Sequence, residues 1–343
     1  MRAFWDPAQR NHAPRFFLQR GQVRPNLETP ERAEALLAGL AALAVVPELP
    51  NPLDRAALLT VHDAAYLDFL AGAPAEWAAL DDAGPELVPN IHPSPEMLAQ
   101  GAVPGGLVGR LGWYTADTSC PIGPHTWPAA CAAAACAIAA ANAVVGGGVA
   151  YALARPPGHH AYPARAGGHC YLNNTALAAE RLRARGATRV GVLDIDAHHG
   201  NGTQGAFWTR DDVRTVSVHG DPAGYYPWYV GHAGEAGAGT GLGANLNLPL
   251  PRGTGDGPWL DRIAHALDWL GDVDALVLAL GFDASVDEPL SFLRITDDGF
   301  ARAAALIAAL IAARRYPTAI VQEGGYNTAT LGPLLARTLG AFG

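Results

Sequence analysis

Short apolar runs alternate with longer stretches of helical character from about residue 149 to the C-terminus. Each run is rich in aliphatic or β-branched residues and is bounded by polar or glycine-rich positions, which is typical of buried strands. Thr296 or Asp297 is well placed to cap one of the helices. The expected strands are 149–154, 190–196, 213–219, 275–281 and 318–322, and the expected helices are 173–185, 258–270, 298–314 and 331–339. This alternation predicts an α/β fold with a mostly parallel sheet flanked by helices.

The first third of the chain has a weaker pattern. We expect helices at 30–44 and 61–70, and the alanine-rich stretch 129–145, which runs into Gly146–Gly148, predicts a buried helix with a glycine stop. The proline- and glycine-rich span 73–126 predicts long loops with little regular structure, and loops of that length usually carry function. No linker is visible, so we expect residues 1–343 to form a single domain, with loops at about 11–29 and 73–126 shaping the entrance of its site.

Composition excludes several chemistries. All 23 basic residues are arginine, so the chain can form no lysine Schiff base, no pyridoxal phosphate aldimine and no P-loop. The net charge of −9 argues against nucleic acid as a partner and favours a cationic small molecule. The N-terminus has no apolar run behind Arg2, and the four cysteines form no C-x-x-C pair. We expect a cytoplasmic protein with no membrane partner, for which a homo-oligomer, dimer or tetramer, is plausible.

Polar residues cluster where four of the expected strands end, and open parallel sheets build their ligand crevices at such ends. Asp194, Asp196 and His198 alternate with apolar residues and so point to one side. Two aspartates at the end of an apolar strand are costly unless a cation or hydrogen-bond donors meet them. Asp196 and His198, together with Asp283 from another strand end, supply three nitrogen and oxygen ligands and leave positions open, as a catalytic zinc prefers.

The motifs in these clusters are specific. They are RPPGHH at 155–160, GGHCYLNN at 167–174, DIDAHHGNGTQ at 194–204, SVHGDP at 217–222, GFDA at 281–284 and QEGGY at 322–326. With these segments in this order, the sequence resembles the zinc-dependent histone deacetylase and acetylpolyamine amidohydrolase superfamily, which has an arginase-like α/β fold. It looks most like the bacterial acetylpolyamine amidohydrolases.

The resemblance implies a role for each matching residue. Asp196, His198 and Asp283 would bind zinc, and His159 and His160 would be the tandem histidines beside the activated water. The residues behind those histidines would be Asp194 for His159 and, for His160, Asn201, where some relatives carry a second aspartate. Tyr326, on its Gly-Gly hinge, would donate a hydrogen bond to the developing oxyanion.

The resemblance also implies a potassium site and a substrate tunnel. A structural K⁺ would be held mainly by backbone oxygens of Asp194, Asp196, His198, Ser217 and Val218. Gly168, His169 and Tyr226 would line the tunnel, in which the family usually has a glycine and two aromatic rings. Histidine at 169 keeps a flat ring but adds a polar edge.

The entrance departs from the polyamine branch of the family. Phe17, Ser119 and Pro128 stand where that branch carries acidic residues that hold the distal ammonium. Neighbouring acids that could substitute for them are Asp81, Asp82, Glu96 and Asp117.

The expected activity is zinc-dependent removal of acetyl or other acyl groups from N-acetylated amines, with acetylpolyamines or other small alkyl amines as substrates. Deacetylation of acetyl-lysine peptides is the first alternative. The others are a binuclear manganese ureohydrolase, which shares the fold but needs a further carboxylate where His199 stands, and a non-catalytic sensor of acyl amines.

Overall fold

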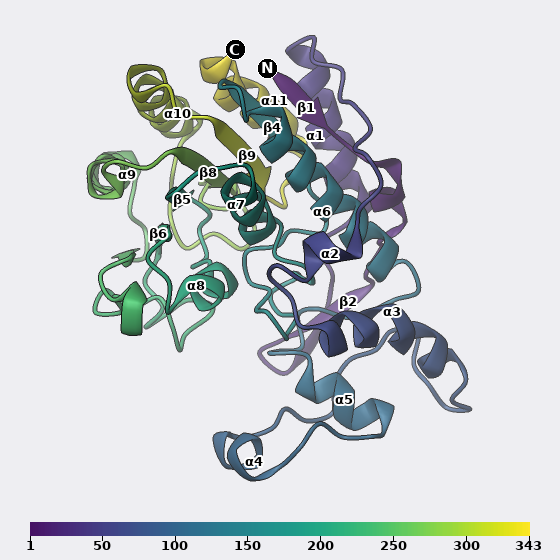
Figure 1. Ribbon diagram of the computed structural model, residues 1–343. Helices are drawn as coiled ribbons and strands as arrows, with labels where there is room; N and C mark the ends of the chain where they lie inside the picture. Colours follow the sequence, from purple (N-terminus) through teal and green to yellow (C-terminus); the bar gives the residue numbers. More distant parts are fainter.

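The computed structural model describes all residues, 1–343. Its centre is a seven-stranded sheet in the order β1-β4-β9-β8-β5-β6-β7, and every neighbouring pair in it is parallel (Figure 1). The expected α/β class, a mostly parallel sheet flanked by helices, is therefore confirmed. The strands are β1 (Arg2–Phe4), β4 (Val149–Ala152), β5 (Val190–Asp194), β6 (Val213–Gly220), β7 (Asn245–Leu250), β8 (Ala275–Leu280) and β9 (Thr318–Gln322).

Side chains that alternate along each strand pack into two separate layers of core. Leu193, Leu278 and Ile320 belong to a cluster of 39 buried residues on one face, whereas their neighbours Val192 and Val277 belong to a cluster of 22 on the other. Strands buried on both faces read as continuous apolar runs, which is why β5, β8 and β9 are visible in the sequence. The first face is covered by α1 (Pro30–Ala42), α9 (Asp256–Leu270), α10 (Asp297–Arg314) and α11 (Thr328–Leu339), and the second by α6 (Thr126–Ala143) and α7 (Asn174–Ala184).

Helix α6 confirms the expected alanine-rich core helix. By length and composition this helix could cross a membrane, but 61% of its 18 residues are buried inside the protein. Its alanine side chains pack against α7 and β4. The small side chains allow this close contact between helices and sheet.

The structure corrects the expectation for the two long loops. Residues 73–126 are not without regular structure, because α3 (Ala64–Ala78) continues to Ala78 and two short helices, α4 (Pro95–Gln100) and α5 (Leu107–Trp113), follow. Residues 11–29 contain a hairpin of β2 (Phe16–Gln19) and β3 (Gln22–Pro25), whose turn has left-handed backbone at Arg20 and Gly21. Two more short α-helices are α2 (Arg55–Leu58) and α8 (Asn201–Phe207), and the 3-10 helices are η1 (Pro7–Asn11), η2 (Gly239–Gly241) and η3 (Gly340–Phe342). Elements of four to seven residues carry too little periodic pattern to be recognised from sequence.

A buried ionic network ties the first third of the chain to the sheet. The Glu28 carboxylate pairs with Arg32 and, at 2.9 Å, with Arg155, and all three side chains are fully buried. Arg32 also donates to the carbonyl oxygens of Glu323 and Gly325, at 2.7 and 2.5 Å. Helix α1 therefore holds the loop that follows β9 in place.

Candidate active site

The four polar clusters come from four strands that are adjacent in the sheet, β4, β9, β8 and β5. Because the sheet is parallel, their carboxyl ends meet at one edge. Strand β5 ends at Asp194 and is followed by two turns that aspartate side chains close. Asp194 accepts a hydrogen bond from the Asp196 backbone N–H at 3.0 Å, and Asp196 accepts one from the His198 backbone N–H at 2.8 Å. These turns replace the last two residues of the strand expected at 190–196.

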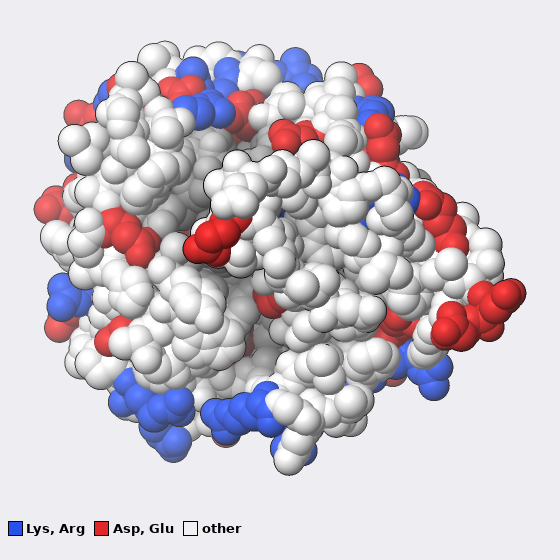
Figure 2. Space-filling view, turned by 90° about the horizontal axis from the view of Figure 1, so that it is seen from below, with Lys and Arg blue, Asp and Glu red and all other residues white.

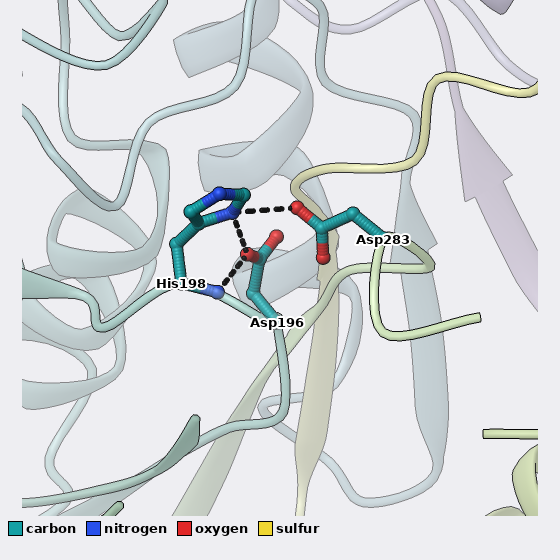
Figure 3. Close-up of side chains that lie close together, drawn as sticks. All are labelled: Asp196, His198 and Asp283. Carbon is teal, nitrogen blue, oxygen red and sulfur yellow. Dashed lines mark hydrogen bonds and ion pairs between the residues drawn. The ribbon is translucent and has the colours of Figure 1, made fainter. Parts of the chain in front are cut away.

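Asp196, His198 and Asp283 point toward one another, with ligand atoms within 4.8 Å of each other (Figure 3). His198 Nδ1 lies 2.8 Å from Asp283 Oδ2 and 3.3 Å from Asp196 Oδ1. All three residues are buried, the two aspartates completely. Two buried carboxylates and one imidazole nitrogen form a donor set that could hold a divalent metal ion.

The electrostatics of this cluster also favour a cation. Burial by itself lowers the pKa of His198, but Asp283 and Asp196 outweigh it and raise that pKa to about 9. Burial, with the charge of Asp196, raises the pKa of the Asp283 carboxyl. Both shifts show an excess of buried negative charge, which a divalent ion would neutralise. The residues present therefore fit a bound metal.

The tandem histidines differ in the side chain behind them. His159 Nδ1 lies 2.9 Å from a carboxylate oxygen of Asp194, whereas His160 Nδ1 lies 2.6 Å from the amide oxygen of Asn201. Burial lowers the pKa of His160 well below its usual value, and the neighbouring His159 and His198 lower it further. For His159, burial is outweighed by Asp196 and Asp194, which raise its pKa well above the usual value. The two pKa values are thus shifted in opposite directions, which suits two groups with different acid–base roles.

Glu323 supports the site, and no role for it was predicted from the sequence. Its buried carboxylate accepts the backbone N–H groups of Gly158 at 2.6 Å and His159 at 3.0 Å, and the hydroxyl of Thr175 at 2.6 Å. It therefore joins the end of β9 to the histidine loop after β4. The available signal was an acidic residue directly after a buried strand.

The Tyr326 loop is held from three sides. Gly324 N–H donates to Asp196 Oδ2 at 2.8 Å, and a Cβ at Gly324 would lie 2.4 Å from Asp283 Oδ2, so only glycine fits. The Tyr326 N–H donates to both oxygens of Glu288, at 2.8 and 2.9 Å, and the Arg32 guanidinium lies 4.8 Å from the Tyr326 ring centre. Glu288 was also missed, because its role depends on a loop 38 residues away in the chain.

A cavity of about 470 Å³ opens over this cluster, and His160, His198 and Tyr326 are among its lining residues. Gly168, His169 and Tyr226 line it as well. A Cβ at Gly168 would lie 2.4 Å from the His160 ring, so glycine is required for the close approach of this wall. The Tyr226 hydroxyl donates to Asp117 at 2.6 Å, which fixes the ring.

The residues that line the cavity do not form an acidic entrance. Phe17 and Ser119 line the cavity, whereas Pro128 lies in α6 and does not. Asp117 supports the wall by accepting a hydrogen bond from Gly168 N–H at 3.1 Å. The other three candidate acids are exposed and do not line the cavity: Asp81, Asp82 and Glu96. The charged lining residues are Arg20 and Arg252. Figure 2 shows the molecule from below, hollowed near its middle, with acidic side chains scattered over this face and arginines along its lower and upper edges.

The residues of the expected potassium site lie on the neighbouring strands β5 and β6 and in the segment that follows β5. Asp194 and Ser217 are register partners on β5 and β6, and Val218 is the next residue of β6. The Ser217 hydroxyl lies 2.8 Å from His219 Nδ1.

Comparisons with known proteins agree with the fold described above. A family model described as the histone deacetylase domain matches residues 26–341. An acetylpolyamine amidohydrolase of Burkholderia pseudomallei is 46% identical, covering 100% of this chain and 99% of the relative, and acetylpolyamine amidohydrolase 1 of Pseudomonas aeruginosa is 39% identical over 91% and 90%. A crystal structure of the acetylpolyamine aminohydrolase from Burkholderia pseudomallei superimposes with a TM-score of 0.95 at 45% identity, covering 100% of this chain and 98% of that one.

Proposed function

The chain belongs to the histone deacetylase family, and we propose that it is a zinc-dependent amidohydrolase that removes acetyl groups from small N-acetylated alkyl amines. The observation that carries the proposal is the tandem pair of His159 and His160, each held through its Nδ1, beside the buried Asp196, His198 and Asp283. Positioned proton-transfer groups next to a metal-ligand set suit the hydrolysis of an unactivated amide.

Asp196, His198 and Asp283 would hold the zinc, which when bound supplies Lewis-acid polarisation of the amide carbonyl and acidifies water. His160 takes the proton of the attacking water and later returns a proton to the leaving amine. Asp194, 2.9 Å from His159 Nδ1, fixes the orientation of the His159 ring beside the site. Asn201 orients His160 without adding a carboxylate that would raise its pKa.

Tyr326 donates its hydroxyl hydrogen bond to the oxyanion that forms in the transition state. Burial raises the pKa of the Tyr326 hydroxyl well above its usual value, so this group keeps its proton. Its loop is fixed by Glu288, Arg32 and Gly324 before substrate arrives, and a preorganised donor is worth more in the transition state than in the ground state.

Tyr326→Phe should therefore lower kcat by ~10²–10³, the usual cost of losing one oxyanion donor. Zinc content and thermal stability should not change, because the loop is held through its backbone. Steady-state kinetics, metal analysis and a melting curve measure this. Tyr229→Phe, at a tyrosine that is 88% exposed, is the matched control and should keep normal turnover. A kcat within threefold of wild type in Tyr326→Phe would remove the hydroxyl from the mechanism.

We propose acetylpolyamines and acetylated diamines as the substrates, and acetyl-lysine in small peptides as the second candidate. Acetylpolyamine is the substrate named for two of the similar proteins, and the wall of Gly168, His169 and Tyr226 suits a slim alkyl stem. The net charge of −9 attracts a substrate whose far end is cationic. Arg20 and Arg252 act against that attraction locally.

A matched pair of substrates tests this assignment. N-Acetylputrescine should be hydrolysed with about tenfold higher kcat/KM at low salt than N-pentylacetamide, in which a methyl group replaces the distal ammonium. The ratio should shrink as salt is raised, because salt screens the field of the protein. Arg20→Gln should raise the ratio by removing a cation from the mouth. Equal hydrolysis of both substrates at low salt would mean that the protein deacylates some other amide.

The proposal also covers a potassium site, the location of the protein in the cell and its oligomeric state. We propose a structural K⁺ at the backbone oxygens of Asp194, Asp196, His198, Ser217 and Val218, where a cation would offset the buried carboxylates. We also propose that the protein acts in the cytoplasm as a homo-oligomer and binds neither nucleic acid nor membrane. Size measurement in solution and the dependence of activity on K⁺ test these points.

A further inference from the structure

The active-site cavity is lined by two arginines, Arg20 and Arg252, and by no carboxylate. Both arginine side chains are exposed. An arginine on an open surface is simply solvated, but charges of one sign around a cavity focus the field there and raise the local concentration of counterions. The mouth therefore carries local positive charge, although the net charge of the protein is −9. An acetylated polyamine, whose far end is cationic, does not account for this charge.

Arg252 is held by a stack of rings that leads to the metal-ligand cluster. It follows β7 (Asn245–Leu250) by two residues, so it lies at the same edge of the parallel sheet as the site. Its guanidinium carbon is 4.3 Å from the centre of the Phe292 ring. The Phe292 ring centre is 4.7 Å from that of Tyr225, and the Tyr225 ring stacks on the ring of His198 at 4.4 Å and 17°. Two rings in contact thus connect the guanidinium to a metal ligand.

The N–H groups of both guanidinium groups are free to bind a ligand. No carboxylate forms an ion pair with Arg20 or Arg252, whereas Arg2 and Arg314, which are also exposed, each have one as a partner. Contact through the flat face of a guanidinium leaves the N–H donors at its edge unused. The planar fork of these donors matches the two oxygens of a carboxylate. The chemistry of the mouth therefore suits a ligand with a carboxylate at its far end.

The reach of the site suits a carboxylate on an alkyl stem. In 6-acetamidohexanoate the six bonds from the amide nitrogen to the carboxylate carbon span roughly 8 Å when extended. The three stacking steps from His198 to Arg252 cover a comparable path once the contacts at the two ends of the substrate are added. The free amino acid Nε-acetyl-lysine has the same stem. An acetamide held beside Tyr326 can therefore place its carboxylate at Arg252.

We propose that Arg252, assisted by Arg20, is a specificity-determining residue that binds a carboxylate at the far end of the substrate. N-Acetylated ω-amino acids, with free Nε-acetyl-lysine among them, are then a second class of substrate for this site. The inference rests on the proposed function. Polyamines are attracted by the overall negative field, whereas amino acids are recognised at the mouth. An acetyl-lysine inside a polypeptide has no free carboxylate and cannot make this contact.

The test compares two substrates that differ in one group, 6-acetamidohexanoate and 6-acetamidohexanamide. Wild-type protein should prefer the carboxylate by about tenfold in kcat/KM, the size of one hydrogen bond between charged groups. In Arg252→Gln this ratio should fall to one or below, because the net negative charge of the protein then repels the anion. Arg252→Lys, which keeps the charge but loses the planar fork, should restore part of the ratio. Arg20→Gln should lower it less than Arg252→Gln does.

Two controls separate loss of the carboxylate contact from general damage. Arg262→Gln removes an exposed arginine of α9 that does not line the cavity, and it should leave the ratio at the wild-type value. Hydrolysis of N-acetylputrescine should rise in Arg252→Gln, because a cation has left the mouth, whereas damage to the cavity would lower it.

The outcomes also distinguish this inference from the proposed function. If the wild type does not prefer the carboxylate, or if the ratio is the same in Arg252→Gln, the role of Arg252 is overturned even though the acetamides are hydrolysed. If the zinc-loaded wild type hydrolyses neither acetamide nor N-acetylputrescine, the proposed function has failed, and this inference fails with it.

Discussion

Asp283→Ala is expected to give a folded protein that has lost both its metal and its activity. Asp283 supplies one of only three ligand side chains, and its Oδ2 lies 2.8 Å from His198 Nδ1. Two ligands hold zinc poorly, and losing the several kcal/mol that a metal contributes to the transition state corresponds to at least ~10³-fold in rate. Metal analysis should find one zinc per chain in the wild type and much less in the variant.

A control separates metal loss from unfolding. Asp298→Ala removes an exposed aspartate that pairs with Arg337 on the surface, and it should keep zinc and full activity. Melting curves of the two variants show whether Asp283→Ala is folded. Two metals per chain with hydrolysis of guanidino substrates would instead restore the ureohydrolase alternative. Zinc binding by the wild type with no turnover of any acyl amine would favour the sensor.

His160→Ala is expected to lower kcat by ~10²–10⁴, because it removes the general base. Its zinc content should be unchanged, since His160 is not one of the three clustered ligands. His265→Ala, at an exposed position of α9, is the matched control and should be fully active. Near-normal turnover in His160→Ala would contradict the mechanism and move the base role to His159.

The pH dependence of the wild-type activity should follow the titration of His160. Burial and the two neighbouring histidines hold the pKa of His160 well below the ordinary value. The base works in its neutral form, so activity falls only as the pH drops through this lowered pKa. The acid limb of kcat/KM should therefore lie below about pH 6.5, the ordinary histidine value, and it should disappear in His160→Ala.

Local pattern predicted the fold class and the cluster of Asp194, Asp196, His198 and Asp283, whereas the roles of the other site residues were implied by the resemblance of their motifs to a known family. The runs that became β5, β8 and β9 are apolar because both faces of each strand are buried, so their pattern does not depend on which strands are their neighbours. Asp194, Asp196 and His198 lie two residues apart, and chemistry that is concentrated in one short segment can be read from that segment. The ends of these strands could be located to within about two residues. At the end of β5, turns closed by aspartate side chains replace the sheet pairing that the pattern predicted.

Only the tertiary structure decided which strand ends meet and what surrounds them. The order β4-β9-β8-β5 brings together segments from residues 155 to 326, and it is set by how the connecting helices pack on the two faces, which no local pattern encodes. Glu288 and Glu323 gained their roles through partners 38 and 165 positions away. Arg20, on the hairpin after residue 15, and Arg252 line the same cavity although 232 positions separate them. Such contacts are long-range in sequence, so their energies enter only when the chain is folded.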